Sequence, residues 1–350
     1  MKRYLQQQEY SRREVLSSAA AGVVALPFWS QVAQANPSPS PSPSLKRFAF
    51  GSCNRQINDQ SFWLNILEDQ PDLWCSLGDN IYADDTTIAE RNGEYERLKL
   101  DPYYSLFSQY IPQRGIWDDH DYASNNKGKE FAEKEQSKKL FMNFFGIDQN
   151  HIMRTQRGIW SAEEFGEQGE KTLLLLLDGR WDKEKQGKTS KILGPEQWAW
   201  LEQQLDKTNA DLIMIGSPIN VSNRFSRFGL EGWAGYPEEK QRLYSLIGKK
   251  TQPVIILSGD RHYGEIVRFP IDRNNGESKI VYEFMSSGLT HSSSFSVPGK
   301  GRVAVARRKN YGVIDINWDT FGQPLVEMSL KDPQTGSMIE NIQCDFDAML

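Results

Sequence analysis

The sequence feature that most constrains the fold is a series of short, continuous apolar runs, each closed by glycine, aspartate, serine or asparagine. Six such runs lie at 48–50, 73–77, 115–117, 173–177, 212–215 and 254–257. Continuous apolar runs of this length are typical of central strands that are buried on both faces. Segments with helical periodicity lie between several of these runs, at 62–67, 134–145, 197–205 and 238–247. The alternation predicts an α/β protein.

The pattern changes after Ser258, because strand-like segments then follow one another without long helices between them. These segments lie at 265–269, 280–284, 311–317 and 324–330. We expect them to form antiparallel strands that close a second sheet. The chain has 350 residues, 38% of them hydrophobic and 25% charged, so it is long enough for one large domain with a sizeable core.

The first 35 residues have the layout of an export signal. A polar start that contains Arg12-Arg13 is followed by an apolar stretch at 19–29 and by an Ala-x-Ala ending. This layout predicts a signal peptide at 1–35, cleaved after its last residue, whose apolar stretch is too short to span a bilayer comfortably. The arginine pair resembles a twin-arginine signal, which implies the twin-arginine export machinery as a partner and a periplasmic or extracellular location. The alternative is an ordinary amphipathic helix.

Residues 37–44 alternate between proline and serine, which predicts an extended, solvated linker at 36–44 before a folded domain at 45–350. The formal net charge of the whole chain is −5, and removal of residues 1–35 leaves about −7 by subtraction. An acidic protein repels polyanions, so nucleic acid is not expected as a stable partner. The three cysteines are too few and too odd in number for a disulfide framework.

Polar side chains that are able to bind metal ions follow four of the predicted strands, in clusters at 51–54, 78–84, 117–121 and 258–265. In α/β sheets the strand ends form the crevices in which ligands bind. Any single aspartate after a strand could simply cap a turn or a helix. Four such clusters in one crevice would bring carboxylates together, which a fold tolerates when cations are present. The clusters therefore predict a metal centre.

The residues of these clusters resemble the motifs of a known family. Gly78-Asp79-x-x-Tyr82, Asp118-Asp119-His120-Asp121 and Gly259-Asp260-x-His262 look like the metal-binding motifs of the binuclear metallophosphatases. With Gly51-Ser52-Cys53, Ser286-Ser287-Gly288-Leu289-Thr290-His291 and Leu193-Gly194-x-x-Gln197-x-x-Trp200-Leu201, the chain is similar to the alkaline phosphatase D (PhoD-like) branch over about 48–317. The resemblance implies a four-layer α-β-β-α sandwich, in which two mixed β-sheets pack face to face between helices.

The resemblance also implies a metal pair, ferric iron with calcium, and a set of ligands for it. Asp79 is the expected bridging ligand, because the two oxygens of one carboxylate can hold two cations about 3.5–4 Å apart. Cys53 and Tyr82 are the expected thiolate and phenolate ligands of iron, with His262 on the same side. Calcium prefers hard oxygens, which Asp119 and Asp260 supply.

Further residues near these ligands have expected roles as well. Asn125 is a weaker candidate ligand, and the sequence leaves open whether Asn125 or Asn126 binds. His120 is expected beside the phosphate, where it would donate a hydrogen bond to the phosphoryl oxygen or protonate the leaving group. His291 is expected near the site.

Arg180 is a candidate for binding the phosphate, because its forked donors suit an oxyanion. The family usually continues from this arginine with Gln-Tyr, whereas this chain continues with Trp181-Asp182. An outward salt bridge from Arg180 to Asp178 or Asp182 is therefore the alternative interpretation.

Together these features predict an exported alkaline phosphatase or phosphodiesterase that acts on a small phosphate ester, with a metal-bound hydroxide as nucleophile. One alternative is a phospholipase-like or phosphotriesterase specificity on the same metals. Trp233 and Tyr236 would then be exposed contacts for an apolar group, although packing is the favoured use of these two aromatics. Another is an exported metal- or phosphate-binding protein without turnover. A cysteine hydrolase built on Cys53 is disfavoured, because no base or orienting partner accompanies it in the sequence.

Overall fold

The computed structural model describes residues 42–223, 230–273, 275–296, 300–319 and 323–347. The chain divides at residue 40 into two units, and everything below concerns the second unit, which begins at Pro41. The export signal predicted for 1–35 lies outside the described residues, as does most of the linker predicted for 36–44. The last part of that linker is in contact with the domain, because the Ser42 carbonyl accepts a hydrogen bond from the Gly166 backbone N–H at 2.8 Å. The prediction of a fully solvated spacer is wrong there.

The first sheet has six strands in the order β13-β12-β11-β1-β2-β3. Their bounds are β1 Arg47–Gly51, β2 Leu73–Leu77, β3 Gln113–Ile116, β11 Tyr311–Trp318, β12 Pro324–Lys331 and β13 Met338–Gln343. β1 pairs in parallel with β2, and β2 pairs in parallel with β3, whereas β11 runs antiparallel to β1. The sheet is therefore mixed, and the carboxyl ends of β1, β2 and β3 lie at one edge of it.

The second sheet has seven strands in the order β10-β8-β9-β7-β6-β5-β4. Their bounds are β4 Ser161–Phe165, β5 Thr172–Leu176, β6 Leu212–Gly216, β7 Val254–Ser258, β8 Gly264–Asp272, β9 Ser278–Ser286 and β10 Arg302–Ala306. The expectation that all late strands close this second sheet is wrong, because β11 to β13 return to β1 in the first sheet. The reason is that an apolar pattern shows that a strand is buried but does not choose its neighbour.

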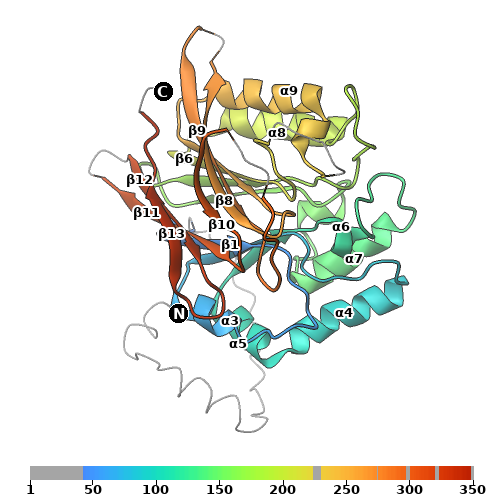
Figure 1. Cartoon of the computed structure of the whole chain (residues 1–350). Helices are drawn as coiled ribbons and strands as arrows, with labels where there is room; N and C mark the ends of the chain where they lie inside the picture. The colour runs from blue at the N-terminus through green and yellow to red at the C-terminus, as the bar shows by residue number, and fades with distance from the viewer. Residues whose placement is uncertain (1–41, 224–229, 274, 297–299, 320–322, 348–350) are drawn as a thin grey trace, which may run out of the picture. The chain divides into compact units, whose positions relative to one another are not determined.

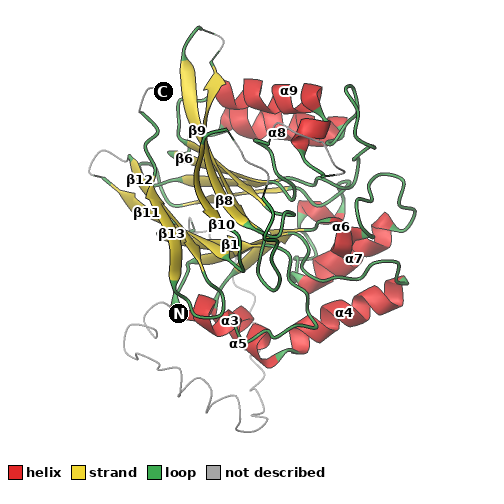
Figure 2. Cartoon of the chain, viewed as in Figure 1, coloured by secondary structure: helices red, strands yellow, loops and turns green. Residues whose placement is uncertain are grey.

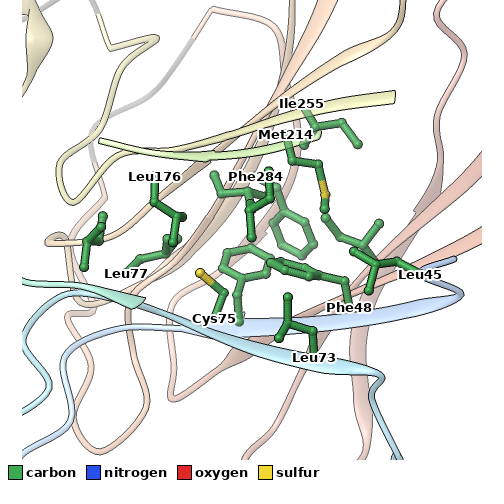
Figure 3. Packing of buried hydrophobic residues seen from close by; sticks show 14 of the residues in the cluster. Leu45, Phe48, Leu73, Cys75, Leu77, Leu176, Met214, Ile255 and Phe284 are labelled. Carbon is green, nitrogen blue, oxygen red and sulfur yellow. The ribbon is translucent and has the colours of Figure 1, made fainter. Parts of the chain in front are cut away.

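The main core lies between the two sheets. Leu174 and Leu176 of β5 point into this core, while Leu173 and Leu175 of the same strand pack on the opposite face. Figure 3 shows Phe48 and Leu73 of the first sheet facing Met214 and Ile255 of the second, with Phe284 between them. Strands that are apolar on both faces in this way account for the continuous runs in the sequence.

Helices cover the outer faces of both sheets (Figures 1 and 2). They are α3 Trp63–Glu68, α4 Ile88–Leu100, α5 Pro102–Tyr110, α6 Asp119–Tyr122, α7 Lys134–Phe144, α8 Pro195–Lys207 and α9 Pro237–Gly248, with short 3-10 turns η1 Ile152–Arg154 and η3 Trp233–Gly235. Trp198 of α8 and Leu243 of α9 pack on the second sheet, and Trp63 of α3 packs edge to face on Trp74 of β2. The four-layer α-β-β-α arrangement is thus confirmed. None of the described helices combines the length and the apolarity needed to cross a bilayer.

Local signals explain where the first helices begin. Thr87 starts α4 through a reciprocal capping box, in which its hydroxyl accepts from the Glu90 backbone N–H while the Glu90 carboxylate accepts from the Thr87 backbone N–H. Asp101 ends α4 and caps α5, and Pro102 occupies the first position of α5, where a missing N–H costs nothing. These caps place α4 and α5 directly after the loop 78–87, which carries part of the site.

Candidate metal centre

Four loops that follow strands bring metal-binding side chains into one cluster. Cys53 follows β1, Asp79 and Tyr82 follow β2, Asp119 follows β3, and His262 follows β7 of the other sheet. Cys53 Sγ lies 3.4 Å from Asp79 Oδ2, and the Tyr82 hydroxyl lies 3.2 Å from the same oxygen and 3.3 Å from His262 Nε2. The cluster lies where the two sheets meet, at the strand ends from which the sequence predicts a crevice.

Asp79 belongs to two groups of potential ligands at once. In the first group, donor atoms of Cys53, Asp79 and His262 lie within 4.8 Å of one another. In the second group, the same is true of Asp79, Asp119 and His120. One carboxylate shared between two sets of donors is the arrangement that a pair of cations requires.

The backbone is strained at four of the predicted ligands. The φ angles are 63° at Cys53, 49° at Asp79, 76° at Asp260 and 59° at His262. Residues with a side chain rarely adopt this left-handed conformation, which costs about 1–2 kcal/mol each. Such strain persists where the surrounding structure imposes it, and it is concentrated at functional sites.

Burial and mutual repulsion act strongly on the carboxylates of the cluster. Burial raises the pKa of Asp79 well above its usual range, and the charges of Asp119, Asp121 and Asp260 raise it further. Burial likewise raises the pKa of Asp260 to about 7. A bound cation reverses this balance, because it stabilises the ionised form of each carboxylate that it touches.

The softer donors show the same need for a cation. Burial, followed by the charge of Asp79, raises the pKa of the Cys53 thiol and of the Tyr82 phenol well above their usual ranges. Burial lowers the pKa of His262 to about 4, so this imidazole is neutral at pH 7 and offers a lone pair.

Asp119 Oδ1 is buried and accepts no hydrogen bond from any described residue. Since buried polar atoms are normally paired, this orphaned oxygen fits a metal ligand.

His120 lies beside the donors and is held by a second carboxylate. Its Nδ1 lies 2.6 Å from Asp84 Oδ2, its ring stacks on Tyr82 with centroids 4.2 Å apart, and its Nε2 lies 3.9 Å from Asp119 Oδ1. Burial lowers the pKa of His120, but the Asp84 hydrogen bond and the charge of Asp119 outweigh it, so the net pKa is raised. Asp84 ends the same 78–84 motif that contains Asp79, and the sequence assigned it no role.

Arg180 does not face the crevice as a phosphate clamp would, and both sequence interpretations of it need correction. Its side chain is fully buried, with Nε 2.6 Å from Asp118 Oδ1 and Nη2 2.5 Å from Glu231 Oε2. The outward salt bridge to Asp178 or Asp182 is therefore wrong, because the guanidinium is enclosed by carboxylates from two other loops. Its Nη2 also lies 3.9 Å from Asp119 Oδ2, and its charge lowers the pKa of this predicted ligand.

Glu231 continues this buried network beyond Arg180. Its second oxygen lies 2.7 Å from Lys183 Nζ, and its backbone carbonyl accepts a hydrogen bond from Arg261 at 2.6 Å. No local pattern indicates this role, because Glu231 lies 51 positions from Arg180 in a glycine-rich stretch without a motif. The network joins the loop after β7 to the loop after β3.

The structure does not bring the two asparagines into the cluster through their side chains. Asn125 and Asn126 are exposed, and they take part through backbone N–H groups that donate to Asp84 Oδ1 at 2.9 Å and to Asp119 Oδ2 at 2.5 Å. These backbone contacts position two carboxylates, and a ligand role for either asparagine side chain stays a prediction. His291 lies where it was expected, with Nε2 3.2 Å from the Tyr82 hydroxyl.

Trp233 and Tyr236 are buried and are therefore not the exposed apolar contacts that the phospholipase-like alternative needs. Trp233 donates a hydrogen bond to Ser217 at 3.0 Å, and Tyr236 donates one to the Glu184 carbonyl at 2.6 Å. Both rings pack among the helices that cover the second sheet. Packing, the other use considered for them, is the one that the structure shows.

Several solved structures share this fold. A structure described as PhoD has 16% sequence identity and a TM-score of 0.66, over 89% of this chain and 74% of that chain. The purple acid phosphatase PPD1 from yellow lupin (Lupinus luteus) seeds has 13% identity and a TM-score of 0.61, over 87% of this chain and 55% of its own. GAP50, the anchor in the inner membrane complex of Plasmodium, has 12% identity and a TM-score of 0.54, over 87% of this chain and 90% of its own. Comparison with the curated proteins finds no match.

Two mixed sheets in a four-layer sandwich are the fold that this chain shares with the PhoD structure and the lupin purple acid phosphatase. The model of the PhoD-like phosphatase family matches residues 48–329, which is most of the sequence. The chain belongs to this PhoD-like phosphatase family, and it is a phosphoric ester hydrolase. The resemblance drawn from the sequence motifs is confirmed.

Proposed function

We propose that this protein is an exported, metal-dependent phosphoesterase that hydrolyses small phosphate esters at a binuclear centre around Asp79. The observation that carries the proposal is that Asp79 is common to two sets of donors, one with Cys53 and His262 and one with Asp119 and His120. The raised pKa of Asp79, caused by burial and by neighbouring carboxylates, supports the presence of cations in the working enzyme.

The chemistry of the donors supports ferric iron on one side and calcium on the other. Cys53, Tyr82 and His262 offer sulfur, phenolic oxygen and nitrogen, which suit a strongly acidic transition metal. Asp119 and Asp260 offer the hard oxygens that calcium prefers. Metal analysis of the protein purified from its native compartment tests both identities, and a centre filled with zinc alone would overturn them.

The protein's own residues divide the work of hydrolysis. When bound, the metal pair would polarise the phosphoryl group and supply the attacking hydroxide. Asp79, which is common to the two groups of donors, would hold both metals. His120, held through Nδ1 by Asp84, directs its other nitrogen toward the donor cluster, where it can protonate the departing oxygen. The raised pKa of His120, caused mainly by its hydrogen bond to Asp84, favours the acid form that this step requires.

The function is tested by assaying metal-loaded protein with p-nitrophenyl phosphate and bis-p-nitrophenyl phosphate. We expect hydrolysis of at least one of them, and loss of that activity after removal of the metals with a chelator, because the metals would supply the attacking hydroxide and burial raises the pKa of the Cys53 thiol. Restoration by iron with calcium would complete the test. Metal-loaded protein that binds phosphate but hydrolyses neither ester would favour the binding protein without turnover.

His120→Ala should keep the metals and lose rate. We expect kcat to fall about 10²- to 10⁴-fold, the usual contribution of a positioned acid. The loss should be larger for an alkyl phosphate than for p-nitrophenyl phosphate, because a poor leaving group depends more on protonation.

Asp84→Asn is the matched variant for that measurement, because it retains the imidazole but removes the carboxylate that orients it. It should show a smaller loss with the same dependence on the leaving group. An equal loss on both esters, or a loss of metal in the His120 variant, would contradict the acid role.

Export is proposed from residues 1–35 of the sequence, with the arginine pair as the targeting element. A route that carries folded proteins suits an enzyme whose metals are inserted before transport. The N-terminal sequence of the protein recovered from outside the cytoplasm tests both export and cleavage after Ala35.

A further inference from the structure

Arg55 lies next to the donor cluster, and its guanidinium forms no ion pair with any described residue. It lies two residues after Cys53, and its guanidinium carbon is 5.0 Å from the centre of the Tyr82 ring. The hydroxyl of the same ring is 3.2 Å from Asp79 Oδ2. The Arg55 backbone N–H donates to Thr290 Oγ1 at 2.7 Å, which fixes the base of the side chain between two loops. The side chain itself is exposed.

Lys309 reaches the same region from the loop between β10 and β11. Its neighbour Asn310 pairs with Gly288, donating a backbone hydrogen bond of 2.9 Å, and this pairing holds the loop against the segment that carries His291. Arg55 is tied to the same segment, through the hydrogen bond of its backbone N–H to Thr290. Two loops that each carry a cation therefore flank the segment 288–291.

Neither cation has an acidic partner. Within the part of the chain that the structure describes, no carboxylate lies within ion-pair distance of Arg55 or Lys309, and the ring of Tyr82 is the contact of Arg55. Some cations elsewhere on the surface are neutralised by ion pairs, such as Arg47 with Asp315 at 2.6 Å and Lys129 with Glu184 at 2.6 Å. Arg55 and Lys309 differ from these in that their charges remain available beside a site for anions.

We propose that Arg55 and Lys309 form a subsite for a second anionic group, a phosphate or carboxylate carried by the alcohol part of the ester. The inference rests on the proposed phosphoesterase function and narrows its substrates to esters with more than one anionic group. The cation–π contact with Tyr82 restrains the guanidinium group, which lowers the entropic cost of offering its forked donors to an oxyanion.

The same loops also carry exposed apolar side chains, which define the competing outcome. Ile57, two residues after Arg55, is 70% exposed, and Phe295, four residues after His291, is 66% exposed. If these side chains set the specificity, an apolar alcohol part would be preferred to a charged one. The two preferences are opposite and can be measured on matched substrates.

The test compares phenyl phosphate with 4-carboxyphenyl phosphate on the metal-loaded, full-length protein. The two esters differ by one carboxylate and have leaving groups of similar basicity. We expect kcat/KM to be about tenfold higher for the carboxylated ester, mostly through KM, because a contact made equally in the ground and transition states lowers KM. Arg55→Gln should reduce this preference to about twofold, and Arg55→Lys should retain part of it. Raised salt should weaken it.

Arg242→Gln is the matched control, because Arg242 is also exposed and lies 4.4 Å from an aromatic ring, that of Trp198. Arg242 belongs to α9, on the outer face of the second sheet, and its loss should leave the preference unchanged. Equal kcat/KM for both esters, a preference for phenyl phosphate, or a preference that survives both Arg55→Gln and Lys309→Gln would overturn the subsite. Absence of hydrolysis of both esters by the wild-type protein would instead contradict the phosphoesterase function.

Discussion

Asp79→Asn abolishes both hydrolysis and tight binding of the metal pair, if Asp79 is the ligand that the two donor groups share. An amide has one oxygen and no charge, so it cannot hold two cations together. Even residues that only orient metal ligands are worth about 10- to 100-fold in affinity or activity, so we expect a loss well beyond 100-fold. Metal analysis and kcat/KM on the same preparation measure the two effects together.

Asp206→Asn is a suitable control, because Asp206 lies exposed on α8, far along the chain from the cluster. Thiolate and phenolate ligation of ferric iron by Cys53 and Tyr82 also predicts a visible absorption band, which Asp79→Asn should lose together with the metal. An Asp79→Asn protein with a full complement of metal would disprove the bridging role. A colourless, fully active wild-type protein would exclude iron.

In metal-free protein, Asp79→Asn should increase the stability of the fold. The pKa of Asp79 is raised in the folded chain by burial and by nearby carboxylates, so its ionisation opposes folding. The unfolded chain releases this proton near pH 4, and metal-free wild-type protein therefore loses stability as the pH rises above that value. Metal-free Asp79→Asn avoids this loss, and thermal unfolding at neutral pH should show it to be more stable than the metal-free wild type.

Arg180→Met should destabilise the protein by about 3–5 kcal/mol, the usual cost of removing one partner from a buried ion pair. Methionine fills much of the volume but leaves Asp118 and Glu231 buried without their shared cation. Lys183 still pairs with Glu231, so the larger share of the loss should come from Asp118. Urea unfolding of the metal-loaded protein measures the change.

A compensating variant separates charge from shape in that experiment. If unpaired charge is the cause, adding Asp118→Asn to Arg180→Met should restore part of the lost stability, although Asp118→Asn alone should destabilise. A change below about 1 kcal/mol in the Arg180 variant, the range of exposed pairs, would show that the buried network contributes little.

The central strands could be predicted from the sequence because burial on both faces requires a continuous run of apolar residues. The run at 73–77 coincides with β2, and the runs at 173–177, 212–215 and 254–257 match β5, β6 and β7 within one residue. α4 was missed because its buried face contains Arg91, a charged residue that hydrogen-bonds to carbonyls such as that of Ala123, together with Tyr95 and Leu98. The apolar residues on this face are too few to produce the periodic pattern from which a helix is predicted.

The site was readable to the extent that its residues lie in local motifs after strands. Cys53, Asp79, Asp119 and His262 were found in this way, and the fold brings them together. The setting of Arg180 was not readable, because its partners Asp118 and Glu231 lie 62 and 51 positions away and no local pattern reports a buried ion pair. The same holds for Asn126, whose contribution comes from its backbone and is independent of its side chain.

The left-handed backbone at positions 53, 79, 260 and 262 creates a conflict between the thermal stability of this protein and its ability to bind metals. Glycine adopts that conformation freely, so glycine at any of these positions would relax the chain while deleting a donor. Selection for thermal stability alone would therefore favour glycine at these four positions and produce inactive proteins. Attempts to make the enzyme more robust should seek their gains in the helices and leave these loops untouched.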